Sequence, residues 1–300
     1  RNKKNTTVPE SFFKDFFRAI ENSGFPCTLK GCSFNNRESL MNTENLARKL
    51  GMEQKTYCSA DGGTLNYCIR KTGDLQSREK AAVMMFLHGA GERGDDNHRQ
   101  LVHCASDLVE FCETEHRKAI LLFPQCPENL MWIHALWSLP EHTMSQEPTP
   151  QLKHAIELLE NTVKQENGDE KRIYIGGISM GAFGTWDALS RRPDLFTAAI
   201  AICGGGDVKQ ASKLVNIPLR VFHGEVDSAV MVKRSRDMVA AIRAAGGTKV
   251  TYTEYPGVDH NSWTQTYADH ENLRWLFSQT RSQMPEVSPS ITGNGGILRE

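Results

Sequence analysis

The sequence predicts a protein of the α/β class, with a mostly parallel eight-stranded sheet, helices on both faces and an antiparallel N-terminal hairpin. The first observation is that short, continuously apolar segments alternate with longer segments whose apolar residues recur at helical spacing. This alternation indicates parallel strands joined by right-handed helical crossovers. The second is a turn signal, Asp61-Gly62-Gly63, between two β-prone segments, which indicates the hairpin. The third is a serine between glycines where a predicted strand meets a predicted helix.

The predicted elements follow the chain in three parts. Residues 1–53 form a helical N-terminal extension, with apolar residues at helical spacing over 11–20 and a further helix near 43–50. Residues 54–280 form the main domain, and residues 281–300 form a disordered tail rich in Pro, Ser and Gly. The strands of the main domain are predicted at 55–58, 65–70, 81–87, 119–123, 172–176, 196–203, 218–222 and 249–255. Its helices are predicted at 100–113, 150–165, 232–245 and 264–278, with one more that begins at Met180.

The composition excludes two classes of partner. The chain has 300 residues, 39% of them apolar, and its 35 basic and 36 acidic residues give a net charge of −1. This balance leaves no basic face for a nucleic acid. No apolar run approaches the roughly 20 residues that span a bilayer. We therefore expect neither a nucleic-acid partner nor a membrane span.

The eight cysteines permit disulfides without requiring them. Cys58 and Cys68 flank the predicted hairpin turn and are the best-placed pair for a bridge, whereas Cys203 ends an apolar strand and is predicted to be a buried thiol. No C-x-x-C pair is present, so no structural zinc site is predicted. A start without Met and the possible bridge favour a secreted or periplasmic protein over a cytoplasmic one. In a secreted eukaryotic protein, the sequon at Asn5 would be a glycosylation site.

The serine between glycines, Ser179 in Gly177-Ile178-Ser179-Met180-Gly181, is the candidate catalytic nucleophile. A strand that turns sharply into a helix holds the turn residue in a strained conformation and lifts its hydroxyl clear of the sheet. Glycines suit the flanking positions because side chains there would collide with the turn. The alternative is an ordinary turn serine, since a chain of this length can contain the pattern by chance.

Two further residues complete a catalytic set at later strand ends. Ligands of open α/β sheets bind beyond the carboxyl ends of the strands, so we expect Asp227 and His260 beside Ser179, in the chain order nucleophile, acid, histidine. His260 would take the serine proton as general base. Asp227 would orient the imidazole and stabilise its charged form. Glu225, on the same loop as Asp227, and Asp259, next to the histidine, are rival acids.

The backbone N–H groups of Ala90 and Met180 are the predicted oxyanion hole. Ala90 lies in a glycine turn directly after a predicted strand, and Met180 opens the helix that follows the serine. The first N–H groups of a helix have no intrahelical acceptor and are free to bind a developing oxyanion. His88 and His223 also end strands, and we interpret both as loop anchors that bond to the backbone.

Several segments together resemble one protein family. They are FLHGAGERGDDN at 86–97, PQCP at 124–127, GISMGAFGTWD at 177–187, ICGGGD at 202–207 and YPGVDHNSW at 255–263. Over about residues 54–280 the chain resembles the phospholipase/carboxylesterase-like serine esterases of the α/β-hydrolase superfamily. This group is often labelled predicted peptidases, because it is similar to the catalytic domains of prolyl oligopeptidases, and dienelactone hydrolase is a relative.

The resemblance implies an α/β-hydrolase fold and a carboxylesterase, without metal or other cofactor, that acts on small or carbohydrate-linked esters of the acetyl or feruloyl type. Ala182 stands where glycine is common in the group, and the cysteine nucleophile of dienelactone hydrolase is not matched. A serine peptidase of the prolyl oligopeptidase type is the enzyme alternative, although the chain has no room for the propeller domain of those enzymes. A non-catalytic binding module on a hydrolase fold is the other alternative.

Gln125, Trp132 and Trp263 are expected to bind the substrate. Gln125 follows a predicted strand, Trp132 lies in the long irregular segment 128–149, and Trp263 closely follows the predicted catalytic histidine. A large flat apolar wall would exclude water and hold the acyl or alcohol part of an ester. We therefore expect Trp132 and Trp263 to line the cleft, with 128–149 as a partial lid. For Trp137 a place in the core is an equal alternative.

Overall fold

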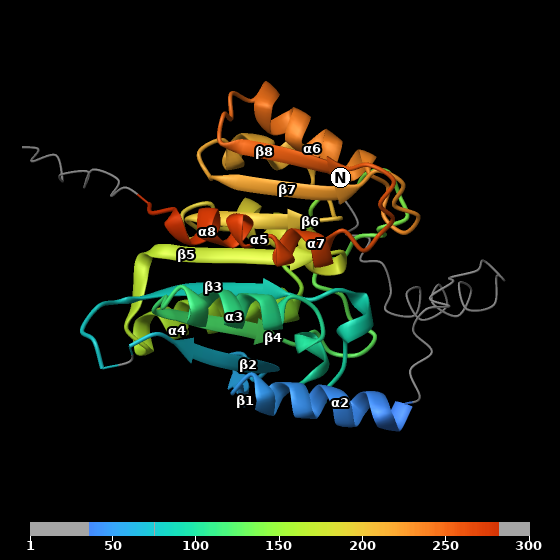
Figure 1. Cartoon of the computed structure of the whole chain (residues 1–300). Helices are drawn as coiled ribbons and strands as arrows, with labels where there is room; N and C mark the ends of the chain where they lie inside the picture. Colours follow the sequence, from blue (N-terminus) through green and yellow to red (C-terminus); the bar gives the residue numbers. More distant parts are fainter. Residues whose placement is uncertain (1–35, 75, 282–300) are drawn as a thin grey trace, which may run out of the picture. The chain divides into compact units, whose positions relative to one another are not determined.

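The strands form one eight-stranded sheet, seen here in a computed structural model that describes residues 36–74 and 76–281 (Figure 1). They are β1 (Glu53–Cys58), β2 (Thr64–Thr72), β3 (Ala81–Leu87), β4 (Ala119–Pro124), β5 (Gly168–Ile178), β6 (Ala198–Ile202), β7 (Leu219–Gly224) and β8 (Val250–Tyr255). Their order is β1-β2-β4-β3-β5-β6-β7-β8. β2 is antiparallel to both β1 and β4, and all other neighbours are parallel. The predicted fold class, with its antiparallel hairpin, is confirmed.

Helices cover both faces of the sheet, as predicted (Figure 1). The α-helices are α2 (Asn36–Lys49), α3 (Ala105–Thr114), α4 (Pro150–Gln165), α5 (Met180–Arg191), α6 (Lys233–Ala244), α7 (Trp263–Ala268) and α8 (His270–Ser278), and the 3₁₀ helices are η1 (Ala90–Glu92), η2 (Arg99–Leu101) and η3 (Val208–Leu214). α3, α7 and α8 contact one another on one face, and α4 and α5 contact each other on the opposite face. Within the described ranges, no helix combines the length and the apolar character needed to cross a bilayer.

The chain divides into two units, Arg1–Met41 and Asn42–Glu300. Helix α2 crosses the boundary. In the second unit its residue Ala47 is buried in the hydrophobic core, and Leu46 and Leu50 pack against that core. The predicted helix at 11–20, the sequon at Asn5 and nearly all of the predicted tail lie outside the described residues.

The strands whose sequences are continuous apolar runs lie in the middle of the sheet. β3, β4 and β6 are buried at every position, because helices cover them on both faces. Their side chains meet aromatic residues from the C-terminal helices: the rings of Phe86 and Tyr267 lie edge to face, 5.6 Å apart. The parallel strands β3, β4, β5, β6, β7 and β8 all end at the same edge of the sheet, so the loops that follow them meet there.

The predicted final helix over 264–278 is two helices, α7 and α8. Asp269 separates them with extended backbone angles (φ −80°, ψ 93°), and its side chain accepts a hydrogen bond from the N–H of Glu271. An aspartate in this position caps a new helix more favourably than it continues the old one.

The predicted bridge between Cys58 and Cys68 is absent. The strand register pairs Cys58 with Thr64 and Cys68 with Gln54, so the two sulfurs lie at different levels of the hairpin. The register differs from the expected one because the turn spans residues 59–63, with Ser59 N–H donating to Gly63 O at 2.8 Å. The free cysteines in the described part of the chain are Cys58, Cys68, Cys104, Cys112, Cys126 and Cys203.

Candidate active site

Ser179 occupies the turn between β5 and α5, in the strand–turn–helix context that the sequence predicts. Its φ of 51° and ψ of −121° lie in a region that non-glycine residues rarely adopt, and its N–H donates to Ile202 O at 2.9 Å. A Cβ at Gly181 would overlap the main-chain oxygen of Leu87, and one at Gly177 would overlap the backbone of Gly181. Only glycine fits these two places, so the turn brings the serine to the sheet edge without steric conflict.

The structure brings Ser179, His260 and Asp227 together. Nε2 of His260 lies 2.9 Å from Oγ of Ser179, and Nδ1 lies 2.8 Å from Oδ2 of Asp227. The side chain of Asp227 is 0% exposed and that of His260 is 24% exposed. The other carboxylate oxygen of Asp227 accepts hydrogen bonds from the N–H groups of Ala229 and Val230, at 2.9 and 2.8 Å. The acid is therefore held rigidly, while the histidine keeps an open side.

The acid and the histidine have pKa values shifted in opposite directions. Burial alone would raise the pKa of Asp227, but hydrogen bonds from His223 and His260 outweigh it and hold the pKa well below its usual range. Burial alone would lower the pKa of His260, but the hydrogen bond to Asp227 and the neighbouring Cys203 sulfur outweigh it and raise the pKa. An ionised acid beside a basic imidazole is the electrostatic arrangement that a general base requires.

The rival acids hold the two loops together instead of facing the imidazole. Oε2 of Glu225 accepts the N–H of Gly257 at 2.9 Å. Oδ1 of Asp259 accepts the N–H of Ser228 and the N–H of His260, both at 2.8 Å. Both carboxylates therefore fasten the loop after β7 to the loop after β8.

His88 anchors two loops, as we interpreted from the sequence. Its Nε2 accepts the N–H of Cys126 at 2.9 Å, which leaves the proton on Nδ1, 2.6 Å from Gly89 O. Burial lowers the pKa of His88 to about 4, so the ring stays neutral. It fixes the start of the glycine turn that carries Ala90.

His223 does more than the loop anchoring expected of it. Its Nε2 lies 3.0 Å from Val230 O and 3.1 Å from Oδ2 of Asp227, and its Nδ1 lies 2.8 Å from Oγ of Ser235. The buried ring therefore contacts the same carboxylate oxygen of Asp227 as His260 does. Its position four residues before Asp227 was the sequence signal that such a contact exists.

The predicted oxyanion-hole residues both begin helices next to the serine. Ala90 is the first residue of η1 and Met180 the first of α5. The position that a Cβ of Gly89 would occupy lies 3.7 Å from Cβ of Ser179, so the glycine turn runs directly past the serine. The N–H groups of Ala90 and Met180, the first in η1 and α5, have no acceptor within their own helices and are therefore available to bind an anion beside Ser179.

Glu92, which sequence reasoning did not single out, lies in the same turn. Its carboxylate is largely buried, with Oε1 3.6 Å from Nε2 of His103 and Oε2 4.0 Å from Nδ1 of His88. Burial raises the pKa of Glu92 to about 7. An acidic residue within an otherwise small-residue turn was the only sequence signal for it.

Trp132 does not line a cleft, contrary to the prediction. Its side chain is 0% exposed, its Nε1–H donates to His88 O at 3.1 Å, and its indole meets the His88 ring at 5.3 Å. The reason is that the segment after β4 packs against His88 at two points, through the N–H of Cys126 and the indole of Trp132. Trp132 therefore supports the loop of Ala90 from within the core.

Gln125 is likewise a supporting residue and not a substrate contact. It is 1% exposed. Its Oε1 accepts the N–H of Asn97 at 2.7 Å, and its Nε2 donates to Oδ1 of Asp96 at 3.0 Å. These bonds satisfy the amide inside the protein and fix the segment that follows the glycine turn.

Trp263, which the sequence predicts to line the substrate cleft, lies beside His260. Its ring stands edge to face with that of His260 (5.4 Å between centroids, 87° between planes), and it lies 5.2 Å from the ring of His103. Trp137, in the irregular segment, is half-buried. That segment is tied to α6 by the buried Arg234, which donates to Leu136 O at 3.0 Å and to Nδ1 of His142 at 2.8 Å.

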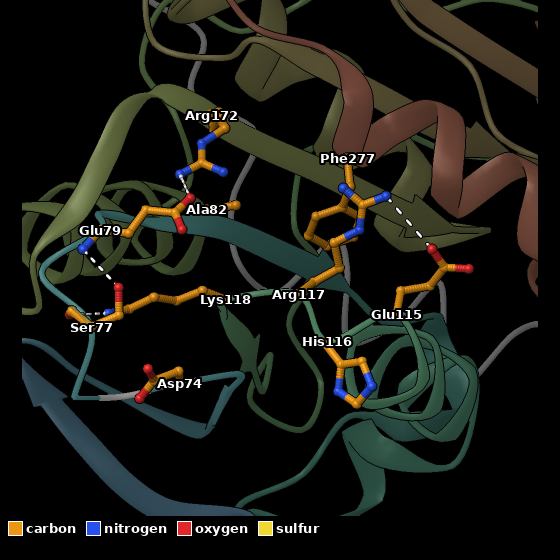
Figure 2. Close-up of a pocket in the computed structure, with 10 residues that line it drawn as sticks. All are labelled: Asp74, Ser77, Glu79, Ala82, Glu115, His116, Arg117, Lys118, Arg172 and Phe277. Atoms are coloured by element: carbon orange, nitrogen blue, oxygen red, sulfur yellow. Dashed lines mark hydrogen bonds and ion pairs between the residues drawn. The ribbon is translucent and has the colours of Figure 1, made fainter.

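A polar cleft of about 460 Å³ lies away from these residues (Figure 2). It is lined by residues near the N-terminal ends of β3, β4 and β5, the sheet edge opposite to Ser179. Its charges are satisfied locally: Arg172 pairs with Glu79 at 3.2 Å, and Lys118 Nζ donates to Ser77 O at 2.6 Å. We therefore assign no part of the candidate chemistry to this cleft.

Comparison with known proteins places the chain in one family. It is similar to the crystal structure of a thermostable esterase, with 37% identity over 77% of this chain and 63% of that chain and a TM-score of 0.69. A ferulic acid esterase shares the fold, at 18% identity over 75% of this chain and 97% of that chain and a TM-score of 0.57. An uncharacterized secreted protein of Arthroderma benhamiae is 24% identical.

The match to the Arthroderma benhamiae protein takes in 83% of this chain but only 30% of that protein. The chain also spans less than two thirds of the length of the thermostable esterase chain. A sequence model of the family described as Phospholipase/Carboxylesterase matches residues 75–273. This match takes in the glycine turn, Ser179, Asp227 and His260. The chain belongs to the phospholipase/carboxylesterase family.

Proposed function

We propose that this chain is a serine esterase that hydrolyses carboxylic esters through an acyl-enzyme, with Ser179, His260 and Asp227 as its catalytic triad. The observation that carries the proposal is the unbroken line of contacts from Ser179 Oγ to His260 Nε2 (2.9 Å) and from His260 Nδ1 to Asp227 Oδ2 (2.8 Å). Family membership supports the same reaction class.

In the acylation step, Ser179 Oγ attacks the ester carbonyl carbon while Nε2 of His260 takes the hydroxyl proton. The carbonyl oxygen becomes an oxyanion, and the N–H groups of Ala90 and Met180 donate hydrogen bonds to it. When the tetrahedral intermediate collapses, the alcohol leaves with the proton from His260. Asp227 stays ionised throughout and stabilises the imidazolium.

Deacylation repeats the sequence with water as the nucleophile. His260 accepts a proton from the water, which attacks the acyl carbon, and then returns it to Ser179 as the acid departs. The open side of His260 (24% exposed) is where the leaving alcohol and the incoming water exchange. No step requires a metal or an organic cofactor.

The substrate class that we propose is a small or carbohydrate-linked ester of the acetyl or feruloyl type. Trp263 supports this choice, because a half-buried indole beside His260 offers an apolar face to a ring or a short acyl chain. We also propose that the protein is exported from the cell, because the similar protein of Arthroderma benhamiae is described as secreted.

The test is ester hydrolysis by the wild type and by Ser179→Ala, with acetyl, feruloyl and longer acyl esters and a prolyl amide in one panel. We expect hydrolysis of esters with little cleavage of the amide, and a fall in kcat on the order of 10⁵ in Ser179→Ala. A fluorophosphonate probe should label the wild type and not Ser179→Ala. If the folded wild type is not labelled and cleaves no ester, the chain is a binding module and the proposal is wrong.

A further inference from the structure

A cysteine that the proposed mechanism does not use lies against the triad. Cys203, at the end of β6, is 0% exposed, and its N–H donates to Phe222 O at 2.9 Å. Its Sγ, one carboxylate oxygen of Asp227 and one ring nitrogen of His260 all lie within 4.8 Å of one another. Three different donor atoms, sulfur, oxygen and nitrogen, therefore lie in one small cluster.

This donor set suits a soft divalent cation. Zn²⁺ binds Cys sulfur at about 2.3 Å and His nitrogen and carboxylate oxygen at about 2.0–2.2 Å, in tetrahedral sites. In such a site neighbouring donors stand about 3.4–3.6 Å apart. Nδ1 of His260 and Oδ2 of Asp227 already stand 2.8 Å apart and would have to separate by less than an ångström. Sγ of Cys203, within 4.8 Å of a ring nitrogen and a carboxylate oxygen, would have to approach by little more than an ångström. A small rotation of the part-exposed His260 ring contributes to both shifts.

We propose that Cys203, His260 and Asp227 form an inhibitory site for Zn²⁺ or a similar soft divalent cation. The proposal deepens the proposed function, since the same histidine serves catalysis. On binding, the thiol of Cys203 loses its proton to solvent, the imidazole binds through one neutral nitrogen, and the carboxylate is already ionised. The fourth position is left to water.

Metal binding switches off the base whichever ring nitrogen is used. If the ion binds Nδ1, the ring proton must sit on Nε2, which can then no longer accept the proton of Ser179. If the ion binds Nε2, that lone pair is consumed directly. The ion reaches the cluster from the side of His260, since Cys203 itself is fully buried.

The ligand types also predict selectivity. Mg²⁺ and Ca²⁺ prefer oxygen ligands and gain little from a thiolate and an imidazole, so they should not inhibit.

The experiment has a binding arm that does not depend on esterase activity. Co²⁺ is added to the full chain carrying Ser179→Ala, and the near-ultraviolet absorption of a cobalt–thiolate bond is followed. In parallel, Zn²⁺ is titrated against ester hydrolysis by the wild type in a buffer without chelators, and activity is restored with EDTA. The variant is Cys203→Ala, with Cys203→Ser as a second variant of nearly native size.

The matched control is Cys112→Ala, which removes another fully buried thiol, on α3. We expect the cobalt–thiolate band in Ser179→Ala and in its combination with Cys112→Ala, and not in its combination with Cys203→Ala. The Zn²⁺ concentration for half-inhibition should rise by about tenfold or more in both Cys203 variants, and Mg²⁺ should have no effect.

Unchanged zinc inhibition in the Cys203 variants, or no cobalt–thiolate band with Cys203 present, would overturn the proposal. If the band depends on Cys203 while no ester in the panel is cleaved, the metal site stands and the proposed esterase function fails. The two proposals are thus tested separately.

Discussion

Asp227 and His260 are 33 residues apart in the chain, and their side chains meet with Oδ2 2.8 Å from Nδ1. The carboxylate is 0% exposed and is also fixed by two backbone N–H groups and by His223. Such a carboxylate favours the imidazole tautomer with its proton on Nδ1. Nε2 then presents its lone pair to Ser179.

Asp227→Asn should therefore lower kcat by about 10⁴, because the amide donates to Nδ1 and reverses the tautomer. The loss is measured on a soluble p-nitrophenyl ester. The matched controls are Glu225→Gln and Asp259→Asn, whose carboxylates bond only to the backbone or to Ser228. A greater loss in Glu225→Gln than in Asp227→Asn would identify Glu225 as the acid.

The pH dependence of kcat/KM should have an acid limb set by His260. The base must be neutral to accept a proton, so the rate rises with pH through the pKa of His260 and levels off above it. Since Asp227 and Cys203 raise this pKa, the limb should lie above the ordinary value of 6.5. Asp227→Asn removes a charge that favours the imidazolium, so its limb should move to lower pH. A limb that moves to higher pH in this variant would contradict the assigned coupling.

The predictable parts of the fold and of the site rest on local sequence patterns and on the topology of parallel sheets. Continuous apolar runs such as 81–87 are buried on both faces of the sheet. They therefore predict the central strands, with boundaries close to those in the structure. Ser179 was found because a strand, a sharp turn and a helix need glycines at fixed places around it. Asp227 and His260 followed from topology, because the loops after parallel strands share one sheet edge.

The parts that sequence could not predict depend on which way a side chain turns. Trp132 and Gln125 follow a strand end, as substrate contacts do, but the chain folds back and buries both of them. The prediction of a Cys58–Cys68 bridge is wrong because the register of a hairpin depends on the length of its turn, which the amino-acid composition of the turn does not determine. Glu92 and Cys203 lie beside the proposed triad through packing between distant segments.

Gly181→Ala should prevent folding to the native state. The added methyl would overlap the main-chain oxygen of Leu87 at the end of β3, and strand backbone cannot move aside as a flexible side chain can. The control is Gly91→Ala, because in the described part of the chain no atom beyond its two sequence neighbours lies within 4 Å of a Cβ placed there. Circular dichroism and urea unfolding measure both variants. A folded Gly181→Ala protein with native stability would show that the close approach of α5 to β3 is wrong.

Trp132→Ala should destabilise the protein without changing its selectivity among esters. A fully buried indole is lost, which costs about 3–5 kcal/mol in the free energy of unfolding. Trp132→Phe keeps an aromatic ring but leaves the oxygen of His88 without its donor, at a cost of about 1–3 kcal/mol. Urea unfolding measures the stability, and KM is compared for acetyl and bulky esters. A rise in KM confined to bulky esters would restore the substrate-contact role.

Trp263→Ala should affect catalysis in two separable ways, because the indole touches the imidazole and is only half-buried. Loss of the edge-to-face contact leaves the His260 ring less firmly placed. Because a misplacement of a catalytic group by about 1 Å can lower the rate on the order of 100-fold, kcat should fall for every ester. Loss of the apolar face should raise KM for a feruloyl ester more than for an acetyl ester.

Trp263→Phe is the matched variant: it keeps a ring beside His260, so kcat should recover while KM for the feruloyl ester stays raised. Steady-state kinetics of both variants on both esters separates these effects. Unchanged kcat in Trp263→Ala would mean that the backbone bonds of the β8 loop suffice to hold His260, and equal KM changes for both esters would exclude Trp263 from the acyl side of the cleft.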